Sequence, residues 1–258
     1  MWERELGAAG RAATAAAKIL MDRFGHVSEI SKKGEIDLVT EADLMAERSI
    51  LEIISRDFPG DGILSEEAGV KEEGSHRIWI IDPLDGTTNF VHGFPFFGVS
   101  LALESEGKPV LGIVYNPFLD EYFEAVRGAG AFLNKKRIQV SSTIDISACL
   151  LATGFPYDIH ENPTKIMEIF SRMITRAQGL RRPGSAALDL CYVAAGKFDG
   201  FWEQGLKPWD TAAGKLIVEE AGGKVTTFEG TTYTPFNNTI IASNGHIHDA
   251  LVRIVNDS

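Results

Sequence analysis

Two segments near the start of the chain repeat their hydrophobic residues at the three- and four-residue spacing of an amphipathic helix. The first, residues 5–24, is rich in alanine and ends near Gly25. The second begins after Thr40-Glu41-Ala42-Asp43, which has the form of a helix capping box, and ends at Pro59-Gly60. The pattern therefore predicts two helices, each with one buried face, separated by a polar, charged loop at residues 31–35.

Hydrophobic residues in the next part of the chain alternate with polar ones or run continuously over short stretches, which is typical of strands. Gly, Asn-Pro and Gly-Lys-Pro turns separate these stretches. The order predicts a meander of mostly antiparallel strands. The predicted strands are residues 62–64, 78–81, 97–104, 110–115 and 121–126.

Helical and extended patterns alternate after residue 140. The predicted strands are residues 150–153, 198–203 and 239–242, and the predicted helices are residues 163–176, 185–195, 209–221 and a last one after Asn244. We therefore expect two parts, an N-terminal α+β part (residues 1–143) and a C-terminal α/β part (residues 144–258). No flexible linker marks the boundary, so the two parts should pack tightly.

Composition narrows the classes of protein that the chain can belong to. Its 258 residues are 44% hydrophobic, which is enough for one large or two small cores and excludes a disordered tail. The net charge of −11 would repel a nucleic-acid backbone. No apolar run has the length of a membrane helix, the start lacks a signal-peptide pattern, and the two cysteines form no C-x-x-C pair. We expect a soluble cytoplasmic protein without nucleic-acid or membrane partners.

The densest chemical signal is the segment Trp79-Ile80-Ile81-Asp82-Pro83-Leu84-Asp85-Gly86-Thr87-Thr88-Asn89-Phe90. A buried strand here leads two carboxylates into a Pro/Gly turn, and no basic residue is nearby in sequence to neutralise them. Aspartates in turns are often only solvated Asx-turn residues. Two carboxylates at the end of a buried strand repel each other, however, unless they share a proton or bind a cation. A hard divalent ion with oxygen ligands suits them best.

Two further acidic residues follow or begin predicted elements. Glu66 comes directly after the apolar segment 62–64, and Asp210 opens the helix predicted at residues 209–221. Taken alone, Glu66 has the features of a surface turn residue, and Asp210 those of an N-cap. Together with Asp82 and Asp85, and without a competing His or Cys cluster, they fit magnesium sites that handle phosphate esters.

Several blocks of the sequence resemble those of the inositol monophosphatase family, in the family's order and spacing. The resemblance covers nearly the whole chain, and the Asp82–Phe90 block is highly specific. It implies a two-part, layered αβαβα sandwich of the inositol monophosphatase and fructose-1,6-bisphosphatase type, Mg²⁺-dependent phosphomonoester hydrolysis and lithium sensitivity. The blocks are residues 37–43, Glu66-Glu67, residues 79–90, Gly184-Ser185-Ala186-Ala187 and Trp209-Asp210-Thr211-Ala212-Ala213-Gly214.

The resemblance also assigns residues to two or three Mg²⁺ ions. Glu66, Asp82 and the backbone carbonyl of Leu84 match the ligands of a first ion, and Glu66 would also hold a third, weaker one. Asp82, Asp85 and Asp210 match the ligands of a second ion. In the reaction that this implies, metals neutralise the phosphate oxygens and an activated water attacks phosphorus directly.

Thr87 matches the family's water-activating hydroxyl, with Asp43 assisting it and Glu66 completing the catalytic set. Asp43 has an alternative role, because Thr40-x-x-Asp43 is also a complete capping box. Gly86 and Thr87 would offer backbone amides to phosphate, although a Gly in a tight turn is equally expected for its conformation.

For the alcohol part of the substrate, the matching positions are Arg181, Gly184, Ser185, Ala186 and Glu203, together with Asp85 and Asp210. Individually, Arg181 could be a solvated residue and Ser185 a helix cap. Lys32, Lys33 and Glu35 match a mobile loop of the family that closes over the metals. His246 and His248 have a metal-like spacing but are expected at the surface.

Two rival functions remain open beside an inositol-phosphate phosphatase. A phosphatase with an aspartyl nucleophile is disfavoured, because its aspartates stand at i and i+2 whereas Asp82 and Asp85 stand at i and i+3. A broader phosphatase acting on fructose 1,6-bisphosphate or nucleotide phosphates would keep the same metal motifs. A non-catalytic regulatory protein could retain the fold.

The family resemblance also implies that the protein is a homodimer.

Overall fold

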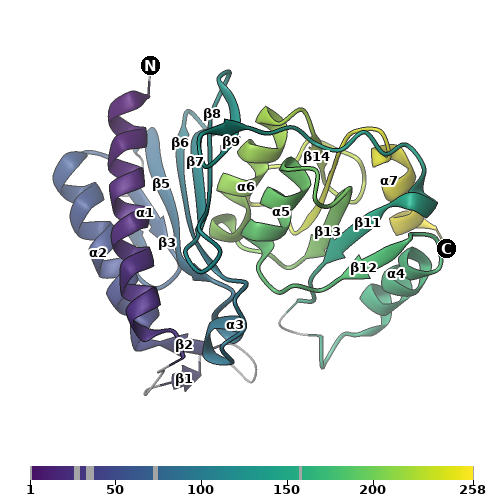
Figure 1. Ribbon diagram of the computed structural model, residues 1–258, viewed down its shortest axis with the longest axis horizontal. Coiled ribbons are helices and arrows are strands. Elements are labelled where there is room, and N and C mark those ends of the chain that lie inside the picture. Colours follow the sequence, from purple (N-terminus) through teal and green to yellow (C-terminus); the bar gives the residue numbers. More distant parts are fainter. Residues whose placement is uncertain (1, 26–29, 33–37, 72–74, 157–158, 258) are drawn as a thin grey trace.

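Figure 1 shows the computed structural model, in which residues 2–25, 30–32, 38–71, 75–156 and 159–257 are described. Helices and sheets stack in five layers, in the order helices, sheet, helices, sheet, helices (Figure 1). The layered αβαβα architecture predicted from the sequence is therefore confirmed. Among the described residues, no helix is both long enough and apolar enough to span a membrane.

The first layer consists of α1 (Glu3–Arg23) and α2 (Glu41–Asp57). Alanines on one side of α1 are fully or almost fully buried, and their small side chains let α1 lie close against α2. The capping box predicted at the start of α2 is present, with the Thr40 and Asp43 side chains each accepting from the other residue's backbone. A short ribbon of β1 (Ile30–Lys32) and β2 (Leu38–Thr40) precedes α2.

The second layer is an eight-stranded sheet in the order β10-β9-β8-β7-β6-β5-β3-β4. Its pairs are antiparallel except β3 with β5, so the predicted meander is confirmed. The short helix α3 (Thr87–Val91) follows β5 directly. The strands are β3 (Gly62–Ser65), β4 (Gly69–Lys71), β5 (Arg77–Asp85), β6 (Gly98–Ser105), β7 (Lys108–Asn116), β8 (Glu121–Val126), β9 (Gly130–Leu133) and β10 (Lys136–Arg137).

The fourth layer is a five-stranded mixed sheet in the order β12-β11-β13-β15-β14. Between the two sheets lie α5 (Ala186–Ala194) and α6 (Pro208–Glu220), and α4 (Thr164–Ile174) and α7 (His248–Asn256) cover the outer face (Figure 1). A 3₁₀ turn (Ile146–Ala148) precedes β11. The strands are β11 (Leu150–Thr153), β12 (Gly179–Arg181), β13 (Gly200–Gln204), β14 (Lys224–Thr226) and β15 (Thr239–Ser243).

Alternation of side chains along the strands explains the layering. In β5, Trp79 and Ile81 pack toward α1 and α2, whereas Ile80 belongs to the core around α5 and α6. In β13, Phe201 belongs to the same central core and Trp202 to the outer core beneath α4 and α7. Both faces of these strands are buried, which is why they appear in the sequence as continuous apolar runs.

Helix α6 lies directly on the first sheet, although it belongs to the C-terminal half of the chain. A Cβ atom added to Gly112 of β7 would lie 2.9 Å from the carbonyl oxygen of Ala213 on α6. The close approach of helix and sheet therefore requires glycine at this position. The central core unites residues of both halves. The division at residues 143 and 144 stays a prediction.

His248 is a correction to the sequence prediction. Its neighbour His246 is exposed as expected, but His248 is buried with both ring nitrogens in hydrogen bonds, to Thr226 Oγ1 and Ser243 Oγ. Burial lowers the pKa of the His248 imidazole to about 4. His248 therefore joins β14, β15 and α7 as a neutral structural residue.

Candidate metal and phosphate site

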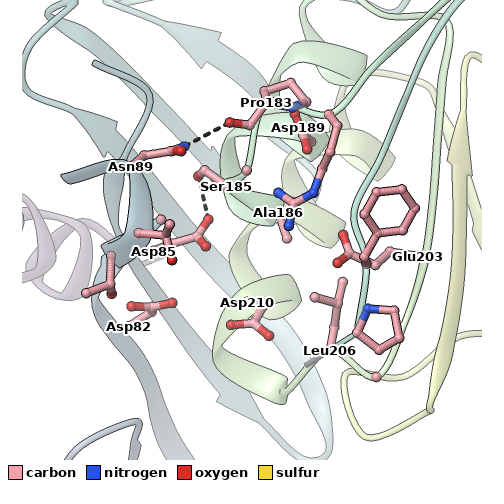
Figure 2. Close-up of a pocket in the computed structure, with 18 of the residues that line it drawn as sticks. Asp82, Asp85, Asn89, Pro183, Ser185, Ala186, Asp189, Glu203, Leu206 and Asp210 are labelled. Carbon is pink, nitrogen blue, oxygen red and sulfur yellow. Dashed lines mark hydrogen bonds between the residues drawn. The ribbon is translucent and has the colours of Figure 1, made fainter. Parts of the chain in front are cut away.

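Asp82 and Asp85 lie three residues apart on β5, and in a regular strand side chains at that spacing point to opposite faces. Here the pairing of β5 with β6 shifts between these two residues, since Asp82 pairs with Ser100 and Asp85 with Gly98. One extra residue on β5 makes a bulge that includes Pro83, which has no N–H to donate to the ladder. The bulge turns the two carboxylates toward the same pocket (Figure 2).

Asp210 reaches the same place from the first turn of α6. Its Oδ2 atom accepts the Lys207 backbone N–H at 2.7 Å, which closes a capping box and fixes the side chain. Figure 2 shows Asp210 facing Asp82 and Asp85 across the pocket. One carboxylate oxygen from each of the three residues lies within 4.8 Å of the others. Two separate segments of the chain thus combine into one set of oxygen donors.

Burial and mutual repulsion dominate the electrostatics of this carboxylate cluster, Asp82, Asp85 and Asp210. The pKa of the Asp82 carboxyl is raised well above its usual value by burial and by the charges of Glu66, Asp85 and Asp210. Burial also raises the pKa of Asp85 to about 6, although Ser185 Oγ and the Ala187 N–H donate to it. Among the described residues, none forms a salt bridge with the cluster. Full ionisation therefore calls for a bound cation.

We predict that added Mg²⁺ stabilises the protein and does so more strongly as the pH rises. A carboxyl whose pKa rises on folding keeps its proton in the native state where the unfolded chain has lost it. For Asp85, without a cation, stability should fall as the pH rises from about 4 to about 6. Excess Mg²⁺ should raise the melting temperature by about 5 °C at pH 7.5 and less at pH 5, measured against matched ionic strength. A pH-independent shift would contradict the cluster's role.

The hydroxyl of Thr87 lies beside the cluster and connects α3 to α2. Thr87 Oγ1 is 3.2 Å from Asp43 Oδ1 and 3.0 Å from the carbonyl oxygen of Leu84. Burial raises the pKa of the Asp43 carboxyl to about 6, against the lowering effect of hydrogen bonds from Thr40. Asp43 is therefore both the partner of Thr40 in the capping box and a neighbour of Thr87.

Glu66 enters the pocket from the turn after β3, and its backbone N–H donates to the Ile81 carbonyl, next to Asp82. The turn is held by a residue that the sequence analysis did not single out. Glu47 on α2 is buried, and its Oε1 atom accepts from Ser65 Oγ, from the Glu67 N–H at 3.0 Å and from the Ala68 N–H at 2.9 Å. One carboxylate oxygen thus holds the Ser65 side chain before Glu66 and the backbone N–H groups of the two residues after it.

We expect Glu47→Ala to raise the Mg²⁺ concentration for half-maximal thermal stabilisation roughly tenfold, because the Glu66 turn loses its anchor. The variant should also lose about 1–3 kcal/mol of stability, since two backbone N–H groups lose their acceptor. Glu47→Gln should be milder, because an amide oxygen still accepts. Glu52→Ala, on the exposed side of the same helix, is the control. An unchanged Mg²⁺ dependence in Glu47→Ala would exclude this positioning role.

The cavity has a volume of about 450 Å³, within the range of small-molecule sites. Beyond the carboxylate cluster it is lined by Gly86, Gly184, Ser185, Ala186 and Glu203, all predicted from the sequence. Gly86 is the N-cap of α3 at a φ of 91°, and a Cβ atom there would lie 3.0 Å from the Phe96 carbonyl oxygen. Burial raises the pKa of the Glu203 carboxyl to about 8.

Arg181 is not among the residues that line the cavity, and its role in substrate binding stays a prediction. Arg181 is exposed at the end of β12 and donates to the Leu180 carbonyl, whereas its neighbour Arg182 lines the cavity. Lys33 and Glu35 of the predicted closing loop lie outside the described residues, and only the backbone of Lys32 is described, in β1.

Several lining residues were not predicted. Asn89 donates to the carbonyl oxygens of Phe96 at 2.7 Å and Pro183 at 2.8 Å and so joins the two halves of the pocket (Figure 2). Asp189 lies one helical turn after Ser185 on α5, a spacing that would have placed both side chains on one face. Phe155 and Leu206 supply apolar lining.

The layered fold and its acidic cavity define a class of proteins: two-sheet α/β proteins with a buried set of oxygen donors suited to divalent cations. The whole chain, residues 1–258, matches the inositol monophosphatase family, and the chain belongs to that family.

Individual relatives agree with this assignment. The inositol-1-monophosphatase of Mesorhizobium japonicum is 44% identical over 248 residues, which cover 95% of this chain and 93% of the relative. A protein of Vibrio cholerae named Nus factor SuhB is 45% identical over 241 residues, covering 92% and 90%. The crystal structure of the extragenic suppressor protein SuhB from Bartonella henselae superimposes with a TM-score of 0.93 at 44% identity, covering 98% of both chains.

Proposed function

We propose that the protein hydrolyses small phosphomonoesters with the help of Mg²⁺, and that an inositol monophosphate is its preferred substrate. The observation that carries this proposal is the position of the carboxylate cluster. It lies at one end of a cavity, beside the Thr87–Asp43 pair, with polar groups for an alcohol at the other end. Membership in a phosphatase family and the name of the Mesorhizobium relative support it.

The donor set fits Mg²⁺ rather than a softer metal. All its side chains are carboxylates, and neither cysteine is among the residues that line the cavity. Glu66, Asp82 and the Leu84 carbonyl would hold a first ion, Asp82, Asp85 and Asp210 a second, and Glu66 a third. When bound, such ions neutralise phosphate oxygens and lower the pKa of coordinated water.

Thr87 and Asp43 would orient the attacking water. The Thr87 hydroxyl can donate to Asp43, which leaves an oxygen lone pair of Thr87 free to accept from a water molecule in the pocket. Thr40 holds the other oxygen of Asp43, so that the carboxylate keeps its orientation. Ser185 donates to Asp85 in the same way, which fixes that carboxylate for its role in metal binding.

The alcohol would occupy the far end of the cavity, near Ser185, Ala186 and Glu203. A ring that carries several hydroxyl groups can hydrogen-bond to Glu203 and to the arginine that faces it, Arg182. Because this end combines polar groups with the apolar side chains of Phe155 and Leu206, we expect a compact polyol to bind there better than an extended nucleotide.

Steady-state kinetics over a panel of phosphate esters tests the proposal. We expect kcat/KM to be highest for myo-inositol 1-phosphate and lower for fructose 1,6-bisphosphate, a nucleoside monophosphate and phenyl phosphate. A higher value for fructose 1,6-bisphosphate or a nucleotide would instead establish the broader phosphatase. The measurement requires Mg²⁺, with a chelator as the control.

The name of the Vibrio relative favours a second candidate, a regulatory protein that binds cellular partners. Such a protein would not need to turn over a phosphate ester. Mg²⁺ binding to the intact protein without phosphate release from any ester of the panel would support that role.

We also propose, from the family resemblance, a cytoplasmic homodimer, and analytical ultracentrifugation tests its oligomeric state.

Lithium should inhibit the reaction uncompetitively. Li⁺ is a small, hard cation that prefers oxygen donors, and we expect it to bind the carboxylate cluster after the ester bond has been cleaved. Turnover measured at several substrate concentrations should then show kcat and KM falling together, with equal concentrations of NaCl as the control. If very high LiCl leaves steady-state turnover unchanged, lithium sensitivity is absent from this member of the family.

A further inference from the structure

Asp189 is a buried acid at the far end of the cavity that the roles above leave without a function. It lies on α5, one turn after Ser185, and its side chain is 1% exposed. Figure 2 shows it on the opposite side of the pocket from Asp82. Asp189 lines the cavity but is not part of the carboxylate cluster. It is therefore placed to meet the alcohol rather than the phosphate.

The hydrogen bonding of the Asp189 carboxylate is incomplete. Its Oδ1 atom has no hydrogen-bond partner among the described residues. By contrast, Asp85 accepts from Ser185 and Ala187, and Asp199 accepts from Ser141 and Leu150. A buried polar atom without a partner is costly, and native proteins rarely keep one unless something outside the chain supplies the hydrogen bond.

The groups around Asp189 are those that recognise hydroxyl groups. Glu203 and Arg182 both line the same end of the cavity, and both act electrostatically on Asp189 with opposite signs. The guanidinium of Arg182 lies over the ring of Phe155, 5.8 Å from its centroid, which keeps it at the cavity wall. Two acids and one arginine thus offer both acceptors and donors, as adjacent hydroxyls of a polyol require.

We propose that Asp189 is a specificity-determining residue that accepts a hydrogen bond from a hydroxyl of the bound alcohol, directly or through one water held in the cavity. The ligand class is a compact polyol with hydroxyls on neighbouring carbons. This inference rests on the proposed function, from which it takes the phosphate ester of a polyol as the substrate. It adds that the preference for a polyol over a simple alcohol depends on Asp189 as well as Glu203.

The test compares two phosphate esters, myo-inositol 1-phosphate, which carries hydroxyls, and phenyl phosphate, which does not. Asp189→Ala should lower kcat/KM for the inositol ester roughly tenfold, mainly through KM, and change that for phenyl phosphate by less than about twofold. Asp189→Asn, which keeps an acceptor oxygen, should recover most of the loss. Asp199→Asn, a buried acid outside the cavity, is the control and should leave the ratio of the two values unchanged.

An equal loss of kcat/KM for both esters in Asp189→Ala, or no loss for either, would overturn the inference. The proposed function fails in a different way, namely if the wild-type protein with Mg²⁺ releases phosphate from neither ester. In that case, ligand-observed NMR with free myo-inositol decides about Asp189, since binding needs no turnover. Weaker binding to Asp189→Ala than to the wild type supports the inference, and equal or undetectable binding to both contradicts it.

Discussion

Asp82→Asn should lower kcat at saturating Mg²⁺ by about 100-fold or more, and Asp210→Asn should have a similar effect. Each change replaces a charged donor by a neutral amide in the carboxylate cluster. Binding of a divalent cation weakens, and phosphate charge in the transition state is no longer neutralised. The measurement is phosphate release as a function of Mg²⁺ concentration, for the wild type and both variants.

The same substitutions should not unfold the protein. In the absence of metal, removing one of three mutually repelling carboxylates should leave stability unchanged or raise it. Melting temperatures in a chelator therefore separate a loss of metal binding from a loss of fold. Asp22→Asn, on the exposed side of α1, is the matched surface control. Near-normal activity of both Asp82→Asn and Asp210→Asn would show that the cluster is not the metal site.

The second large effect concerns Thr87 and Asp43, for which a structural role and a catalytic role predict different results. If Asp43 only completes the capping box with Thr40, Asp43→Asn should cost up to about 1 kcal/mol of stability and leave kcat nearly intact. If it orients Thr87, kcat should fall by roughly 100-fold with little change in KM. We expect the second result, because the Asp43 carboxylate contacts both residues.

A double-mutant cycle tests whether the pair acts as a unit. Thr87→Ala should lower kcat about as much as Asp43→Asn, and the double variant should be scarcely worse than either single one. Thr87→Ser, which keeps the hydroxyl, should retain most of the activity. Losses that multiply in the double variant would show independent roles and return Asp43 to a purely structural function.

Local patterns in the sequence predicted most of the long elements and the acidic residues. The residues 79–90 predicted a buried strand that ends in two carboxylates, and β5 with its bulge at Pro83 is that feature. The alternation of polar and apolar residues does not reveal the bulge, because a bulge is defined by how a strand pairs with its partner strand. Short strands such as β4 and β12 were missed for the same reason, since their hydrogen bonds go to a partner strand.

Residues that act across the fold were the hardest to predict. Glu47 contacts the Glu66 turn from 18 or more positions away, and the same helix pattern would fit a solvated glutamate. Arg182, the residue that directly follows β12, lines the cavity, and the sequence alone does not show where β12 ends. Gly154 gives a further example, since a Cβ atom there would lie 2.0 Å from a carboxylate oxygen of Glu203. Such constraints become visible only when the chain is folded.

Phosphate release that depends on Mg²⁺ bound at the carboxylate cluster is tested most directly by following Mg²⁺ binding and phosphate release on the same sample. Calorimetry gives the Mg²⁺ occupancy, and release of inorganic phosphate from myo-inositol 1-phosphate gives the activity. We predict no release in a chelator, release that increases in parallel with Mg²⁺ occupancy, and the loss of both in Asp82→Asn. Phosphate release in the chelator, or full release by Asp82→Asn at the same Mg²⁺ concentration, would show that hydrolysis does not depend on Mg²⁺ at the carboxylate cluster.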